Sequence, residues 1–128
     1  MPLSRLLALP LLAIAITPIS AQAPATVQIQ LANFSFSPKT IILEHGRPSV
    51  LRLANVADGG HDFTAKEFFV AASIASEDRP WVQEGVVEVP AGQVRDIHLT
   101  APAAGSYKLK CSHSFHKMFG MSGTIVVR

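Results

Sequence analysis

Apolar and polar residues alternate along most of the chain after residue 25, which is the pattern of β-strands with one buried and one wet face. The alternation begins over residues 27–31 and continues over 34–36 after a shift in phase at 32–33, which could be a bulge. Turn residues separate the further strands that the pattern predicts, which are 40–43, 49–55, 85–89, 94–100, 105–111 and 123–127. About seven or eight short strands with breakers between them predict an all-β domain, a β-sandwich.

One segment in the middle of the chain departs from this pattern. Residues 65–76 carry apolar side chains near the 3.6-residue spacing of a helix, and Pro80 follows them closely. The spacing predicts one short helical insertion, a helix or two turns, within the sandwich.

The first residues have the pattern of an export signal. A positive charge at Arg5 precedes an apolar run over 6–16. Residues 21–23 fit a cleavage pattern of small residues and residues 19–21 are also acceptable, and a cut after Ala21 avoids Pro24 as the first mature residue. We expect residues 1–21 to be a cleaved signal peptide, residues 22–128 to be the mature domain, and the protein to be periplasmic. A membrane anchor is the alternative, but a span needs roughly 20 apolar residues and Pro10 interrupts this run.

Length and charge set limits on the partners. The chain has 128 residues, enough for one domain, and a formal net charge of +2 that falls to about +1 once Arg5 is removed. The basic residues form no stripe with interleaved aromatics, so we expect no nucleic-acid partner. We expect a monomer with no membrane span after cleavage.

The chain contains a single cysteine, Cys111. Exported proteins meet oxidising conditions, and this thiol has no second cysteine in the chain to pair with. A lone thiol there is expected to be buried, joined to another chain or bonded to a metal.

Soft metal donors gather around that cysteine. Cys111, two histidines and both methionines other than Met1 fall within eleven positions, between two predicted strands; they are Cys111, His113, His116, Met118 and Met121. Thiolate, thioether and imidazole donors select copper over harder metals. Two histidines and a cysteine with a weak axial methionine form a blue-copper site, which suits electron transfer.

The pattern Cys111-x4-His116-x4-Met121, followed by Ser-Gly-Thr-Ile-Val-Val, resembles the ligand loop and last strand of cupredoxins. It is most similar to the small periplasmic plastocyanin/azurin-like group. Residues 51–55 and 60–63 resemble the segment that supplies the first histidine of those proteins, which makes His61 the matching position. The resemblance implies a Greek-key sandwich holding one copper ion, Cu(I) or Cu(II), between His61, Cys111, His116 and Met121.

The resemblance also implies a role for Asp62, because the residue after the first histidine steadies the cysteine loop in many cupredoxins. We therefore hypothesise that Asp62 contacts Ser112 or the Cys111 sulfur and helps to orient the ligands.

The loop departs from the family pattern at one place. Cupredoxins commonly have Pro-Gly before the second histidine, where this chain has Ser114-Phe115. His113 and Met118 are surplus donors, so ligation by His113, or by Met118 in place of Met121, stays open.

Other residues of interest have ordinary interpretations. We expect His45 and His98 to be solvated surface residues, and Trp81 to be a packing residue. Phe115 and Phe119 flank His116 and could form an apolar surface for a partner, or could pack inward.

These observations predict a one-electron carrier whose redox partner, or a copper-handling protein, docks near His116. The first alternative is a periplasmic copper carrier or copper-resistance protein, which the surplus donors favour. The second is a structural zinc site formed by Cys111, His113, His116 and His61. We expect no enzyme activity, because the chain supplies one set of ligands and no recognisable catalytic motif.

Overall fold

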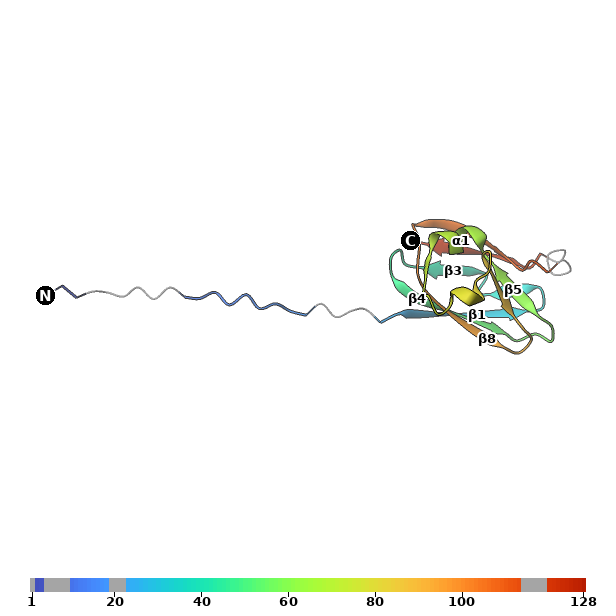
Figure 1. The fold of residues 1–128 in the computed structure, drawn as a ribbon. Coiled ribbons are helices and arrows are strands. Elements are labelled where there is room, and N and C mark those ends of the chain that lie inside the picture. The colour runs from blue at the N-terminus through green and yellow to red at the C-terminus, as the bar shows by residue number, and fades with distance from the viewer. Residues whose placement is uncertain (1, 4–9, 19–22, 114–119) are drawn as a thin grey trace.

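Two five-stranded β-sheets form the body of the protein (Figure 1). The computed structural model describes residues 2–3, 10–18, 23–113 and 120–128. The first sheet has the strand order β2-β1-β4-β8-β6 and the second has the order β3-β10-β9-β5-β7. Within the described residues the strands are β1 (Ala25–Ala32), β2 (Ser35–Ser37), β3 (Thr40–Leu43), β4 (Pro48–Asn55), β5 (His61–Thr64), β6 (Ser73–Ile74), β7 (Val86–Val89), β8 (Val94–Thr100), β9 (Gly105–Lys110) and β10 (Ser122–Val127).

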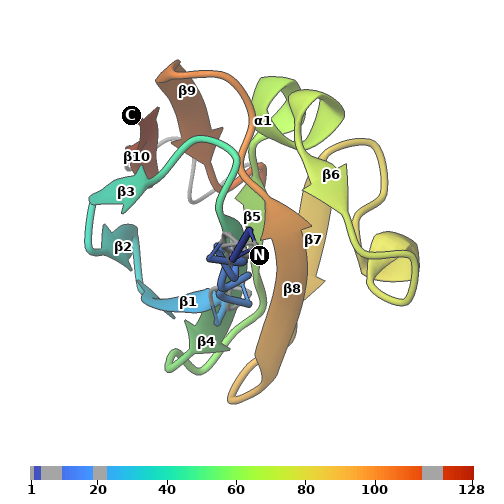
Figure 2. The same ribbon diagram turned by 90° about the vertical axis from the view of Figure 1, so that its left-hand side faces the viewer.

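The chain passes from one sheet to the other at each connection from β2 to β9 (Figure 2). Each sheet contains one parallel pair, β1 with β4 and β3 with β10, while the other named pairs are antiparallel. These crossings bring β5 and β9 side by side in the second sheet, although 40 residues separate Thr64 from Gly105.

The inner faces of both sheets form one hydrophobic core, as the alternating pattern requires. Phe63 of β5 is fully buried, and its ring makes edge-on contacts with Phe36 and Phe69, with centroids 5.9 Å away in each case. The helix α1 (Lys66–Ala71) contributes Phe69 to this cluster and packs Phe68 against Tyr107 of β9. Helix and sheet are therefore held together by aromatic contacts, which tie α1 to the strands that carry the site.

The predicted strands and turns are confirmed at most positions, with three corrections. The phase shift at 32–33 is no bulge but the turn of a hairpin, because β1 pairs antiparallel with β2 and Phe34 adopts φ 64°. The helix is shorter than predicted, because residues 73–74 form the edge strand β6 beside β8. Residues 61–64 form a strand, β5, that the pattern did not predict, since all four of its side chains are buried and show no alternation. The ten strands of the described chain therefore exceed the seven or eight expected.

The segment before the sandwich has a different character. Residues 10–18 have no secondary structure and extend away from the sandwich (Figure 1). Their side chains are exposed. Among the described residues, no helix has the length and apolar character needed to cross a bilayer.

Candidate metal centre

Three neighbouring strand ends of the second sheet carry three of the four predicted ligands. His61 is the first residue of β5, Cys111 directly follows β9, and Met121 directly precedes β10. The side chains of all three are buried, with exposed fractions of 0%, 0% and 1%. The Cys111 N–H donates a hydrogen bond of 3.0 Å to the Met121 carbonyl, so both ends of the loop between them are fastened to each other.

The thiol and the imidazole from distant parts of the chain meet at this end of the sheet. The Cys111 Sγ lies 4.0 Å from the His61 Nδ1. Two donors bound to one ion at about 2.0 and 2.3 Å, at angles between tetrahedral and trigonal, would lie about 3.6 Å apart. The pair is therefore within a small adjustment of the separation that a shared metal ion requires.

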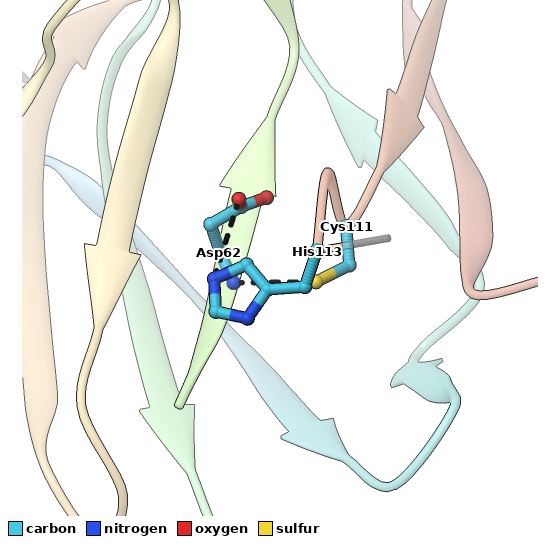
Figure 3. A group of neighbouring side chains, drawn as sticks. All are labelled: Asp62, Cys111 and His113. Atoms are coloured by element: carbon cyan, nitrogen blue, oxygen red, sulfur yellow. Dashed lines mark hydrogen bonds and ion pairs between the residues drawn. The ribbon is translucent and has the colours of Figure 1, made fainter. Parts of the chain in front are cut away.

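Asp62 fastens the loop that follows the cysteine (Figure 3). Its Oδ1 accepts hydrogen bonds of 2.8 Å from the Ser112 N–H and from the Thr64 hydroxyl. Its Oδ2 accepts a short hydrogen bond from the Ser112 hydroxyl. The backbone N–H of Asp62 also points at the Cys111 sulfur, 3.5 Å away. The hypothesis that Asp62 contacts Ser112 or the cysteine sulfur is confirmed.

The surroundings of the Cys111 thiol favour its protonated form in the absence of a metal. Burial raises the pKa of this thiol, although backbone N–H groups of Asp62 and His113 directed at the sulfur act in the opposite sense. A bound cation would displace this proton, because the thiolate is the form that ligates metals.

His113 lies at the rim of the same site. One donor atom from each of Asp62, Cys111 and His113 falls within 4.8 Å of the others (Figure 3). The His113 Nε2 lies 3.2 Å from the Glu88 Oε2 and 3.7 Å from the Asp62 Oδ2. Its side chain is 35% exposed, so it stands between the buried site and solvent.

Glu88 is a member of this group that the sequence did not indicate. It lies on β7 directly opposite Asp62 of β5 in the strand register. Alternation along 86–89 marks Glu88 as outward-facing, but only the pairing of β5 with β7 places it beside the loop. Finding it from sequence would have required that pairing.

Several predicted site residues lie outside the described residues. These are His116, the proposed second imidazole, together with Met118, Phe115 and Phe119. The expectations that concern them therefore stay predictions.

The remaining singled-out residues lie away from the site. His45 and His98 are exposed as expected; the His45 Nδ1 is 2.8 Å from the Pro102 carbonyl, and the His98 Nδ1 is 2.8 Å from the Asp78 Oδ2. Trp81 is 50% exposed, and the Arg95 guanidinium lies 4.4 Å from the centre of its ring.

Comparison with known proteins identifies the family of the chain. The family model described as "Cupredoxin-like domain" matches residues 5–127. No curated protein sequence matches the chain.

Solved structures resemble the whole domain at low sequence identity. A dithionite-reduced auracyanin from Roseiflexus castenholzii is 18% identical, with a TM-score of 0.62 over 84% of this chain and 99% of that one. Auracyanin A from Chloroflexus aurantiacus, described as a "blue" copper protein, is 16% identical, with a TM-score of 0.60 over 83% of this chain and 100% of that one. A multicopper oxidase from Campylobacter jejuni is 11% identical, with a TM-score of 0.62 over 88% of this chain and 32% of that one. These likenesses confirm the predicted class of fold, an all-β sandwich with one short helix.

Proposed function

The chain belongs to the cupredoxin-like domain family, and from this premise we propose that it binds one copper ion and carries single electrons. The observation that carries the proposal is the buried Cys111 sulfur 4.0 Å from the His61 Nδ1, at the strand ends that also carry Met121. A thiol, an imidazole and a thioether are soft donors that suit copper. Auracyanin A, one of the structural neighbours, is described as a "blue" copper protein.

The proposed ligands are His61, Cys111 and His116, with Met121 as the axial donor. Copper supplies a one-electron couple, Cu(II)/Cu(I), when it is bound. The chain's own contribution is a fixed site with buried donors: His61 belongs to a strand, Cys111 and Met121 flank paired strands, and Asp62 holds the backbone after the cysteine. Ligands held in this way move little between oxidation states, which keeps the reorganisation per electron small.

Titration of the metal-free protein with Cu(II), followed by ascorbate, tests this proposal. We expect an intense visible thiolate-to-copper absorption band that saturates at one copper per chain and disappears on reduction. Cys111→Ser should abolish the band, while His98→Gln, a substitution at an exposed histidine, should leave it unchanged. Stoichiometric copper binding by the wild-type protein without such a band would overturn the proposal.

Substitution of Met121 separates copper from a structural zinc site. A weak axial ligand tunes a blue-copper site, so Met121→Leu should shift the absorption band and the reduction potential. A zinc site formed by Cys111 with His61, His113 and His116 would bind Zn²⁺ equally well in this variant and in the wild-type protein. Preferential retention of zinc over copper, unaffected by Met121→Leu, would replace the copper proposal.

Copper delivery is the second candidate, and the position of His113 favours it. Its imidazole lies within 4.8 Å of the Cys111 sulfur and is partly exposed, so it could accept an ion that leaves the buried site. A carrier should lose copper to a weak chelator within seconds, and His113→Ala should slow that loss. Retention of copper through repeated redox cycles, with no effect of His113→Ala on exchange, would favour electron transfer.

The proposal also includes the setting of the protein. We propose export to the periplasm, removal of residues 1–21, a monomeric mature protein, and docking of a redox partner near His116. Electron carriage needs no catalytic group, and the function proposed is not that of an enzyme.

A further inference from the structure

The outer face of the second sheet carries a lysine patch, which we define as Lys66, Lys108 and Lys110. These lysines line a shallow concavity of about 210 Å³ together with Thr64 and Glu67. Lys108 and Lys110 point outward from β9 on either side of the buried Leu109. Lys66 is the first residue of α1, which contacts β9 (Figure 2).

The patch has an unbalanced positive charge. Three ammonium groups face one carboxylate, that of Glu67, which leaves a formal excess of +2 around the concavity. Within the described part of the chain, no carboxylate lies within 4.0 Å of any of the three ammonium groups. Two acidic side chains on the adjoining strands β5 and β7 are engaged elsewhere, Asp62 with Ser112 and Glu88 with His113. Glu84 lines a neighbouring concavity with Lys66 but forms no ion pair with it among the described residues. The lysines are therefore available to a negatively charged partner.

The patch is also joined directly to the ligand loop. Lys110 precedes Cys111 in the chain, and its backbone pairs with Thr64 across β9 and β5. Thr64, which lines the concavity, donates a hydrogen bond to Asp62, and Asp62 accepts from the Ser112 N–H. A partner seated on the patch would thus be connected to the cysteine by one covalent link and by a short chain of hydrogen bonds.

We propose that the lysine patch is a docking surface for an electron-transfer protein with an acidic face. Oppositely charged surfaces raise the rate of encounter between two proteins and orient them, and salt weakens this effect. The inference rests on the proposed one-electron function, because docking here is useful when the metal centre exchanges electrons. It adds a second surface to the partner site expected near His116.

Reduction of the copper-loaded protein by ferrous cytochrome b5, an acidic haem protein, tests the proposal by stopped-flow absorption. One electron leaves the ferrous haem and one is taken up by the oxidised protein, with no proton required. We expect the second-order rate constant to fall at least tenfold between about 10 and 500 mM NaCl, because salt shortens the screening length several-fold over this range. Lys110→Glu should lower the low-salt rate constant about tenfold and have little effect at high salt.

Two controls separate docking from net charge and from damage to the site. Arg128→Glu makes the same change in charge at the end of β10 away from the ligand loop, and should change the rate constant less than twofold. Lys66→Glu places the reversed charge on the helix instead of the ligand strand, and should reproduce the effect of Lys110→Glu. Hexaammineruthenium(II), a small cation, should reduce all the variants without the loss seen with cytochrome b5.

Nuclear magnetic resonance of the metal-free protein tests docking without electron transfer. Ferric cytochrome b5 should shift the amide signals around Lys66, Lys108 and Lys110, and inorganic phosphate at matched ionic strength should not. These signals would still report docking if the protein failed to bind copper, so failure of the inference is distinguishable from failure of the proposed function. Equal effects of Lys110→Glu and Arg128→Glu, shifts confined to another face, or the same shifts with phosphate alone would each overturn the inference.

Discussion

The Asp62 carboxylate makes three hydrogen bonds with described residues and accepts in all of them, from Thr64 and twice from Ser112. The side chain is fully buried, and its charge is one of the causes that raise the pKa of the neighbouring Cys111 thiol. Asp62 therefore has an electrostatic effect on the site besides its structural one.

Asp62→Asn removes that charge and keeps the shape of the side chain. We expect the variant to bind copper with an unchanged type of spectrum and a higher reduction potential, because the carboxylate favours the more positive oxidation state. Opposite unit charges 4 Å apart interact by about 4 kcal/mol at an effective dielectric constant of about 20. An Asp62 carboxylate oxygen lies within 4.8 Å of the Cys111 sulfur, so an ion bound to that sulfur would be at most about 7 Å from it, and the same expression then gives about 2–3 kcal/mol. Spectroelectrochemical titration measures the shift, and a lower potential than that of the wild-type protein would contradict the argument.

Cys111 predicts the pH dependence of copper binding. Burial raises the pKa of the thiol, so near neutral pH the metal-free protein holds a proton that copper must displace. At pH values below that pKa, the affinity for copper should rise about tenfold for each unit by which the pH increases, because binding releases one proton from the thiol. This dependence applies once the histidines are neutral. Calorimetry at pH 8 in buffers of different ionisation enthalpy should report about one proton released per copper. Release of none would mean that the thiol is already ionised or does not ligate.

At the level of single residues, the sequence supported His61, Cys111, Met121 and Asp62 as members of one site. The described structure places these four residues together. Metal ligation by His61, Cys111 and Met121 is the part of the proposal that spectroscopy tests. The sequence did not indicate Glu88, because an exposed glutamate on an alternating strand is expected on the solvent-facing side of any sheet. Only the register of β5 against β7 brings it beside His113.

The pairing of β3 with β10 depends on a glycine at the start of the last strand. A Cβ atom at Gly123 would lie 2.5 Å from the Lys39 carbonyl oxygen and 3.2 Å from a methyl carbon of Leu109. The same carbonyl accepts the Thr124 N–H at 2.9 Å, so it cannot move away without loss of that hydrogen bond. The close approach of these two segments therefore requires a residue with no side chain.

Gly123→Ala should lower the free energy of unfolding by about 1–3 kcal/mol, as overpacking in a filled site does. Gly59→Ala is the matched control, because a Cβ at that position would meet nothing within 4 Å, and its effect should stay within about 0.5 kcal/mol. Urea denaturation of the metal-free proteins measures both values. Equal stability of the two variants would show that the contact between Gly123 and Lys39 yields easily.

At the level of strands and helices, the alternation of apolar and polar residues predicted the strands that have one solvent-exposed face. The pattern failed to predict β5, because a strand that is buried on both faces shows no alternation. His61 and Phe63 face the core, and the side chains of Asp62 and Thr64 on the other face are buried as well. It also extended the helix into β6, since Ser73 and Ile74 continue a helical spacing but pair with β8. Short edge strands depend on tertiary pairing that no local pattern contains.

The whole domain is built so that ligands distant in sequence lie at one end of one sheet. The crossings between sheets place β5 beside β9, and β10 on the other side of β9. Local patterns predicted a sandwich without this order. The likeness of two short ligand segments to cupredoxins supplied the topology, because such connectivity is a property of families and is not specified by alternation alone.

The first 21 residues should be dispensable for the folded domain. The described residues 10–18 are exposed and without secondary structure, whereas the strands begin at Ala25. We expect protein 22–128 and the full chain to unfold at the same temperature within about 2 °C, because no core residue is lost. Protein recovered from the periplasm of an expressing bacterium should begin at Gln22. A mature chain that retains residue 1 would contradict the proposed cleavage.

The hydrogen bond from the Cys111 N–H to the Met121 carbonyl continues the β9–β10 ladder up to the base of the ligand loop. The nine residues between these two positions are therefore bracketed by a closed hairpin stem, and the sandwich can tolerate replacement of those beyond Ser112, which donates to the buried Asp62 carboxylate. Loops of other lengths and compositions could be grafted between the same two anchor points without a new scaffold. Natural variation or design could in this way retune the metal's affinity and colour independently of how the domain folds.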